Sequence, residues 1–274
     1  MTTHLGLIII GDEILSGKRA DKHLPKTIEL LAARGLSLSY AHCIGDDPAR
    51  ITATLASAFA SARDFGDVIF SCGGIGATPD DHTRYCAAKA LGVDMVLHPE
   101  AKALITERMR DTAKEQGVPF EADRHDNIHR LNMGVFPVGA DIVPNPYNKI
   151  PGFSCTAGHG AIHFLPGFPV MAWPMMAWVL DTHYAHLHQS AAYTEKSVIV
   201  MGSMEATLTP LMVEIETVHN GVKVFSLPSV DHPVYGRHIE LGVKGSPDAV
   251  EAAFTALVSG LKPFRVQLGP ELVR

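Results

Sequence analysis

Residues 68 to 81 read Val68-Ile69-Phe70-Ser71-Cys72-Gly73-Gly74-Ile75-Gly76-Ala77-Thr78-Pro79-Asp80-Asp81. The apolar run at 68–71 is typical of a short buried strand, and a glycine-rich loop follows it directly. Thr78 is a favourable N-cap, Pro79 suits the first turn of a helix, and the two acids complement the positive end of a helix dipole. The segment therefore predicts a strand, a loop and a helix in succession.

The residues before this segment repeat the same order of elements. The aliphatic run at 5–10 ends at Gly11 and predicts a strand that is buried on both faces. A helical pattern at 24–34 ends before a glycine, and an alternating strand pattern follows at 36–44. Asp47 is placed to cap a further helix over 48–62, with Pro48 in its first turn. Alternating strands and helices predict an α/β fold with three layers and an open, mostly parallel sheet.

The remainder of the chain predicts a second, smaller domain. Residues 94–130 are mostly helical and charged, and 135–165 are rich in Gly and Pro, so short strands and shaped loops are expected there. Residues 171–184 predict a covering helix. After residue 190 the pattern is βαββα, which predicts a small α+β domain with an antiparallel sheet. We therefore expect domains at 1–188 and 189–274.

Composition limits the classes of function. The chain has 274 residues, of which 46% are hydrophobic and 19% charged, with a net charge of −6 when His is neutral. This balance argues against bulk electrostatic binding to nucleic acid or to an anionic membrane. No apolar run approaches the ~20 residues that span a bilayer, and the N-terminus lacks the basic segment of an export signal. A cytoplasmic protein is predicted.

The glycine-rich loop is the most informative candidate site. In an open parallel sheet, ligands bind beyond the carboxyl ends of the strands. Glycines let backbone N–H groups approach an anion closely, so a phosphate is the expected ligand. The dinucleotide fingerprint is not satisfied because Pro79 stands where the third glycine is required, and no P-loop motif is present.

Acidic side chains accompany the predicted phosphate site. Asp46, Asp80 and Asp81 would repel a phosphate unless a divalent cation lay between them and shared its oxygens. The alternative is that Asp46 forms a turn and that the other two acids complement the helix dipole. The residues alone leave both interpretations open.

A family resemblance follows from the order of the motifs. The motifs are Gly11-Asp12-Glu13-Ile14-Leu15-Ser16-Gly17, Gly45-Asp46-Asp47, the loop of residues 73–83, Asn145-Pro146 and Leu165-Pro166-Gly167-Phe168-Pro169. Together they resemble the molybdopterin-binding MoaB/Mog-like domain, and within that superfamily the N-terminal part of the CinA family. The resemblance covers about residues 4–184, and the small domain resembles the second CinA domain. We do not expect the nicotinamide-nucleotide amidase activity of longer members, because the motifs and the small domain account for nearly all of the 274 residues.

The resemblance implies binding of a phosphorylated pterin, such as molybdopterin, or of a nucleotide. Some members hydrolyse the pyrophosphate bond of ADP-ribose-like substrates with a divalent metal such as Mg²⁺, Mn²⁺ or Co²⁺. The residues that it implies for catalysis and for the metal are Asp46, Asp80 and Asp81, with Asp81 orienting water or the metal. The residues that it implies for ligand binding are Gly11, Asp12, Glu13, Gly17, Gly73, Gly74, Gly76, Thr78, Thr83, Asn145, Pro166 and Gly167.

The chain departs from the family pattern at several positions. Asp12 replaces a usual Thr, Asp21-Lys22-His23 replaces a D/N-x-N element, and Met171 and Met133 replace an acidic residue and a Gln. Two functions therefore stay open: a metal-dependent nucleotide pyrophosphatase, or a non-catalytic binder or accessory protein of molybdenum cofactor biosynthesis. The expected partner is a small phosphorylated molecule, and the resemblance is compatible with a homo-oligomer.

Overall fold

The computed structural model describes residues 3–188 and 194–274. The chain divides into two compact units, Met1–His188 and Gln189–Arg274. Residues 1–2 of the first predicted domain and 189–193 of the second lie outside the described residues. Across the described ranges, no helix is both long enough and apolar enough to cross a lipid bilayer.

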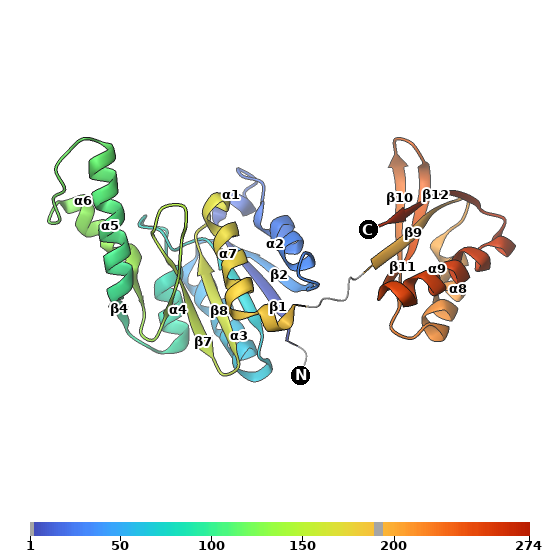
Figure 1. Cartoon of the computed structure of the whole chain (residues 1–274), viewed down its shortest axis with the longest axis horizontal. Coiled ribbons are helices and arrows are strands. Elements are labelled where there is room, and N and C mark those ends of the chain that lie inside the picture. Colours follow the sequence, from blue (N-terminus) through green and yellow to red (C-terminus); the bar gives the residue numbers. More distant parts are fainter. Residues whose placement is uncertain (1–2, 189–193) are drawn as a thin grey trace. The chain divides into compact units, whose positions relative to one another are not determined.

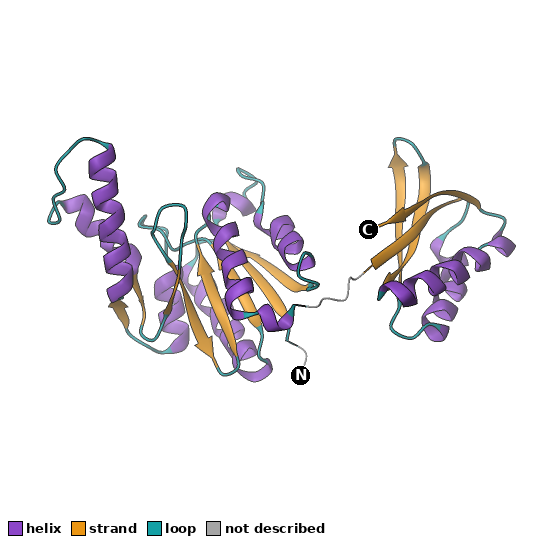
Figure 2. Cartoon of the chain, viewed as in Figure 1, coloured by secondary structure: helices purple, strands orange, loops and turns teal. Residues whose placement is uncertain are grey.

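The first unit combines a large sheet with helices (Figures 1 and 2). Its strands are β1 (Leu5–Ile10), β2 (Leu38–Ile44), β3 (Val68–Cys72), β4 (Met95–Leu97), β5 (Val135–Pro137), β6 (Asp141–Val143), β7 (Gly152–Ala157) and β8 (Gly160–Leu165). Its helices are α1 (Asp12–Leu15), α2 (His23–Ala32), α3 (Pro48–Phe65), α4 (Thr83–Leu91), α5 (Pro99–Glu115), α6 (His125–Leu131) and α7 (Pro169–His183).

The main sheet has six strands in the order β2-β1-β3-β8-β7-β6. The pairs β1–β2, β1–β3 and β3–β8 are parallel, whereas β7 pairs antiparallel with β8 and β6. Successive side chains of β1 enter opposite faces, as the pleat requires. Ile8 and Ile10 pack in one cluster with residues of α3 and α4, and Leu7 and Ile9 pack in another with residues of α2 and α7. The sheet is thus covered on both faces and forms the middle of three layers.

Helices α5 and α6 lie in the segment between β4 and β5, outside the main sheet. Strands β4 and β5 form a two-stranded antiparallel ribbon. Helix α5 buries Ala101, Ile105 and Met109 in the same cluster as Phe136 of β5. Burial of a large apolar side chain contributes roughly 1.5–3 kcal/mol to the free energy of folding, so these contacts attach helix α5 to the core.

The second unit has its own sheet and core. Its elements are β9 (Thr194–Met201), α8 (Glu205–Val218), β10 (Lys223–His232), β11 (Gly236–Gly245), α9 (Pro247–Gly260) and β12 (Gln267–Val273). The sheet order is β10-β11-β9-β12, all pairs antiparallel. Helices α8 and α9 pack against it through Leu211, Ile215 and Phe254. The predicted fold, a mostly parallel α/β sheet with a smaller α+β unit, is confirmed, and β12 is an additional strand.

Candidate ligand-binding site

Three loops meet beyond the carboxyl ends of the central parallel strands. They follow β1, β3 and β8, which are neighbours in the sheet. The amide of Gly73 donates to the carbonyl of Leu165 at 3.0 Å, which joins the loop after β3 to the end of β8. The amide of Gly11 donates to the carbonyl of Ile44 at 3.0 Å, which joins the ends of β1 and β2. This is the edge at which open parallel sheets bind ligands.

The loops surround a cleft of about 680 Å³. Most of the predicted site residues line it, namely Gly11, Glu13, Asp46, Gly73, Gly74, Gly76, Thr78, Asp80, Asp81, Pro166 and Gly167. The predicted residues outside this lining are Asp12, Gly17, Thr83 and Asn145. Lys18, Arg19 and Phe168 also line the cleft and were not predicted.

The glycine loop needs backbone conformations that other residues rarely adopt. Gly73 has φ 110° and Gly74 has φ 67°, both in the region that favours glycine. A Cβ at Gly73 would collide with the carbonyl oxygen of Ile10, and one at Gly74 with the hydroxyl of Thr83. Across the described residues, the amides of Gly74, Gly76 and Ala77 donate no hydrogen bond. They are therefore available to an anion in the cleft.

Thr83 lies beneath this loop and not in the cleft. It is buried, its hydroxyl donates to the carbonyl of Gly73 at 3.1 Å, and its amide donates to the carbonyl of Gly74 at 3.0 Å. The prediction that Thr83 contacts the ligand is therefore corrected: this side chain holds the loop in shape, because the two nearest loop carbonyls use its donors.

Arg84 supports the loop from the same side and was missed by the sequence analysis. It is buried, and one guanidinium nitrogen donates to the carbonyl oxygens of Ile75 and, at 2.6 Å, Gly76. Burial lowers the pKa of this guanidinium below its ordinary value, although arginine stays charged in proteins. Arg84 is in the first turn of α4, where the helix dipole disfavours a cation. A cation at this unfavourable position in the sequence could have indicated that Arg84 has a role other than stabilising the helix.

The helix after the loop begins later than predicted. Helix α4 starts at Thr83, and residues 78–81 form a turn. The carboxylate of Asp81 accepts from the Thr78 amide at 2.8 Å and from its hydroxyl at 2.6 Å. These two bonds satisfy Thr78 within the turn, so it does not cap a helix. Asp81 therefore stabilises the turn and also lines the cleft.

Asp12 and Asp46 bridge the first two loops. The amide of Asp12 donates to the Asp46 carboxylate at 2.8 Å, and the amide of Asp46 donates to the Asp12 carboxylate at 3.2 Å. Partial burial raises the pKa of Asp46, and the charges of Asp12, Glu13 and Asp80 raise it further against the lowering effect of the Asp12 amide. A Cβ at Gly45 would meet the Asp12 carboxylate, so glycine lets this carboxylate lie close to the second loop.

The predicted metal site fits this arrangement poorly. Across residues 3–188 and 194–274, no three His, Cys, Asp or Glu side chains are grouped so that they could hold a metal ion. Asp46 and Asp81 each direct a carboxylate oxygen at a protein donor. Joint ligation by Asp46, Asp80 and Asp81 stays a prediction, in which Asp46 and Asp81 would use the carboxylate oxygen that does not fix the loops.

A smaller pocket of about 140 Å³ adjoins the cleft. The two share Ile75, Gly76, Pro166 and Phe168 in their linings. Asn145, predicted to contact the ligand of the main cleft, lines this smaller pocket. Its amide donates to Asn148 Oδ1 at 2.8 Å and to the carbonyl of Ile150 at 2.9 Å. Asn145 therefore organises the loop before β7.

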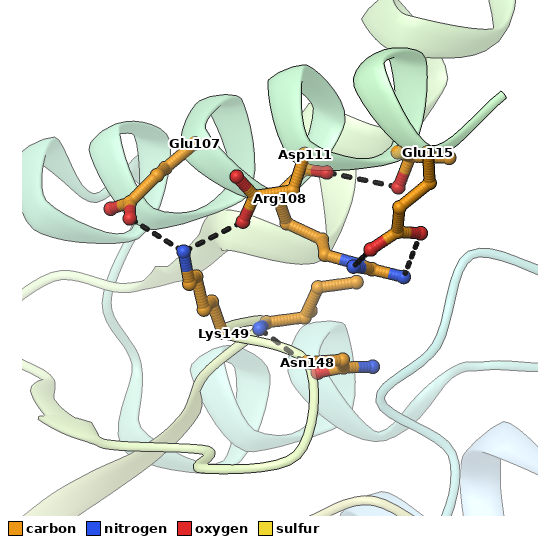
Figure 3. Close-up of polar contacts among 8 residues, drawn as sticks. Glu107, Arg108, Asp111, Glu115, Asn148 and Lys149 are labelled. Atoms are coloured by element: carbon orange, nitrogen blue, oxygen red, sulfur yellow. Dashed lines mark hydrogen bonds and ion pairs between the residues drawn. The ribbon is translucent and has the colours of Figure 1, made fainter. Parts of the chain in front are cut away.

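Helix α5 holds the same loop through ion pairs (Figure 3). Lys149 Nζ lies 2.6 Å from Glu107 Oε1 and 2.6 Å from Asp111 Oδ2. The Asp111 carboxylate raises the pKa of Lys149 by hydrogen bonding, with a further contribution from Glu107. Lys149 has φ 64°, an uncommon value for a residue with a Cβ. The pairs accordingly help to fix the backbone beside Asn148.

Comparison with known proteins shows the family to which the chain belongs. Residues 6–186 match the family model described as "Probable molybdopterin binding domain". A protein of Caldivirga maquilingensis is 30% identical over 271 residues, covering 95% of this chain and 98% of that protein. A CinA-like protein of Anaeromyxobacter sp. (strain K) is 30% identical over 164 residues, covering 60% of this chain but 37% of that protein.

The fold is also found among solved structures. The crystal structure of the protein CinA with unknown function from Thermoplasma acidophilum is 24% identical, with a TM-score of 0.54. It covers 66% of this chain and 97% of that chain. At this identity the likeness concerns the fold alone.

Proposed function

Since the chain belongs to the probable molybdopterin binding domain family, we propose that its cleft binds a phosphorylated pterin or nucleotide. The observation that carries this proposal is that Gly74, Gly76 and Ala77 line the cleft and that, within the described residues, their amides donate no hydrogen bond. Backbone N–H groups in a glycine-rich turn form a concave site for phosphate. Lys18 and Arg19 line the same cleft and supply cations.

The side chains of the cleft support ligand binding, and two of its acids also hold the loops. The carboxylates of Asp46 and Asp81 accept hydrogen bonds from Asp12 and Thr78, and they stabilise the loops in doing so. Within the described residues each of these carboxylates keeps one oxygen that accepts no hydrogen bond, so a divalent cation that bridges the acids and the phosphate is compatible with the loops. We propose an accessory or ligand-binding role, because Met171 stands where the family usually has an acidic residue, and we assign no step to a metal.

Calorimetric titration with inorganic pyrophosphate, ADP-ribose and molybdopterin tests the proposal. We expect saturable binding of pyrophosphate, and tighter binding of the ligands that carry a ring. Absence of binding by all three would contradict the proposal. Release of AMP from ADP-ribose with Mg²⁺, Mn²⁺ or Co²⁺ would instead support the hydrolase and contradict the non-catalytic version.

A matched pair of glycine variants tests the loop itself. Gly74→Ala adds a Cβ that meets the Thr83 hydroxyl at a residue with positive φ, so pyrophosphate affinity should fall about tenfold or more, equivalent to about 1.4 kcal/mol. Gly92→Ala is the control, because Gly92 has φ 70° at the end of α4 and a Cβ there meets nothing within 4 Å. Both variants strain the backbone, but only the first should weaken binding. Equal affinities would argue against the loop as the anion site.

A further inference from the structure

Two histidines of helix α6 hold one ring nitrogen each against the other. His125 and His129 are exposed, and residues four apart lie on one face of a helix. Their Nε2 atoms are 3.3 Å apart, and the ring centroids are 4.4 Å apart with the ring planes at 67°. At this distance one imidazole donates a hydrogen bond and the other accepts it. Neither histidine lines the anion cleft.

The separation of the two nitrogens matches that of two ligands of one metal ion. Zinc binds histidine nitrogen at about 2.0–2.1 Å with tetrahedral angles, so two nitrogens on the same ion lie about 3.3–3.4 Å apart. The ion would take the place of the proton that the two rings share. Imidazole suits zinc, copper and nickel, whereas carboxylate and water suit magnesium. The pair therefore favours a transition metal.

The inner face of α6 holds the pair in this arrangement. Asn127 lies between the two histidines in sequence and is buried, and its Nδ2 donates to the carbonyl of Glu121 at 2.7 Å. Its Oδ1 accepts from Arg130 at 2.9 Å. Helix α6 also packs beside α5 (Figure 1). These contacts fix one face of the helix and leave the face with both histidines open to solvent.

The surroundings of the pair are compatible with a hydrated cation. Two imidazoles supply half of a tetrahedral shell, and the described part of the chain groups no third His, Cys, Asp or Glu with them, so water would complete the shell. Charge does not oppose a cation, because the acids Glu121, Asp123 and Asp126 outnumber the bases Arg124 and Arg130 in this segment. The Asp126 carboxylate accepts from Arg124 at 2.8 Å and lies 3.5 Å from Arg130, which weakens the repulsion by both guanidinium groups.

We propose that His125 and His129 together bind a divalent transition metal ion such as Zn²⁺, and that the ion stabilises helix α6. The helix has seven residues, whereas isolated helices shorter than about 12–15 residues are marginal in water. An ion that binds only the folded helix stabilises it, because the two ligands come together only when the turn between them is formed. This site is independent of the anion cleft.

Calorimetric titration of the full chain with Zn²⁺ tests the joint site. Excess Mg²⁺ in every titration occupies sites made of carboxylates, which that ion prefers. We expect His125→Gln and His129→Gln each to weaken Zn²⁺ binding about tenfold or more, because the second bond to an ion already held is intramolecular. The double variant should lose little beyond either single one, since each change alone already removes the joint site.

A matched variant controls for the loss of one exposed histidine. His159 is exposed in the turn between β7 and β8, and His159→Gln should leave the Zn²⁺ affinity unchanged. Circular dichroism checks the fold of each variant. A double variant that loses the sum of the two single effects would show two independent weak sites and would overturn the proposal, as would single variants that bind Zn²⁺ like the wild type.

Hydrogen exchange of wild-type protein locates the ion without any substitution. With free Zn²⁺ at ten times its dissociation constant, amides of α6 should exchange about tenfold more slowly, because opening of the helix releases the ion. The same Zn²⁺ should not slow exchange at α6 in His129→Gln. Saturable Zn²⁺ binding with unchanged exchange at α6 would place the ion elsewhere and would contradict the inference. Neither result changes the expectation for pyrophosphate at the glycine loop.

Discussion

Arg84 places a positive charge under the glycine loop without entering the cleft. Its guanidinium holds the carbonyls of Ile75 and Gly76, and peptide planes that turn their carbonyls inward turn the following amides outward. The residue thus acts in two ways: it orients the donors, and its charge favours an anion on the other side of the loop. We regard it as a positioning residue.

Arg84→Leu should lower pyrophosphate affinity between about tenfold and a hundredfold, because hydrogen bonds to a charged group contribute about 1.5–3 kcal/mol. Arg84→Lys should recover part of the loss, since lysine keeps the charge but not the planar fork. Calorimetry measures both, and Arg63→Leu, at an exposed arginine on α3, is the control. Equal affinities in Arg84→Leu and wild type would refute the positioning role.

His163 makes stability depend on pH. Its ring is buried and contacts Ser154 Oγ at 2.6 Å and the Tyr184 hydroxyl at 2.8 Å. Burial, with a smaller effect of His183, lowers its pKa to about 3, against about 6.5 in an unfolded chain. Between these values the unfolded state binds the extra proton, so stability falls as pH decreases from 6.5 towards 3.

At pH 5.5 the effect of His163 should be about 1.4 kcal/mol relative to pH 7.5. Urea unfolding at both pH values measures it, and His163→Gln is the comparison because it removes the titrating group. We expect the wild type to lose more stability on acidification than the variant. A parallel loss in both proteins would show that other groups are responsible.

Some of the site could be predicted residue by residue, and some could not. Gly73, Gly74 and Gly76 were identifiable because a glycine-rich loop after a parallel strand has few other uses, and the topology brings Pro166 and Gly167 to the same edge. The direction of the Asp81 carboxylate depends on the shape of its own turn, which the spacing does not specify. The sequence pattern therefore predicted which residues lie near the cleft better than it predicted the hydrogen bonds that their side chains make.

At the scale of elements, helix α3 illustrates a successful prediction. Asp47 was expected to cap it, and the Asp47 carboxylate accepts from the Arg50 amide at 2.7 Å, with Pro48 in the first turn. Local chemistry alone decides such a cap. Helix α9 (Pro247–Gly260) is likewise the second helix of the βαββα pattern that the sequence predicts.

Asp47→Ala should reduce the free energy of unfolding by about 1 kcal/mol, because an orphan amide at the helix start loses its acceptor. Asp64→Ala, near the carboxyl end of the same helix, is the matched control and should cost less, since an acid there opposes the dipole. Chemical denaturation of the two variants gives the comparison. An equal loss in both would contradict capping by Asp47.

Other elements escaped prediction for physical reasons. Strand β12 contains Gly269 and Pro270, both unfavourable in strands, and it is held by pairing with β9. Strand β4 is three residues long and exists through its pairing with β5. The start of α4 was misplaced because Asp81 satisfies Thr78 locally. In each case a partner distant in sequence, or a side-chain contact, outweighed the local pattern.

At the scale of the whole molecule, the two units have separate hydrophobic cores, which implies that each can fold without the other. The residues that line the cleft and the small pocket all belong to the first unit. The core of the second unit is built from its own strands and helices, including Val200, Leu241 and Leu257. Neither core needs side chains of the other.

Residues 1–188 expressed alone should fold and bind pyrophosphate with the affinity of the full chain, because both clusters under the main sheet come from that range. Calorimetry of the two proteins measures this, and circular dichroism checks the fold of the fragment. A folded fragment that no longer binds would assign part of the site to residues 189–274.

The distribution of thiols gives a chemical handle on this molecule. Cys72, Cys86 and Cys155 are buried, while Cys43 is exposed on β2, three residues before Asp46. A maleimide dye should therefore attach at Cys43 in the native state and reach the other sulfurs only after unfolding, although desolvation raises the pKa of the Cys43 thiol and slows its reaction. The fluorescence of that single dye would report ligand binding at the loop that contains Asp46, and no cysteine would have to be introduced.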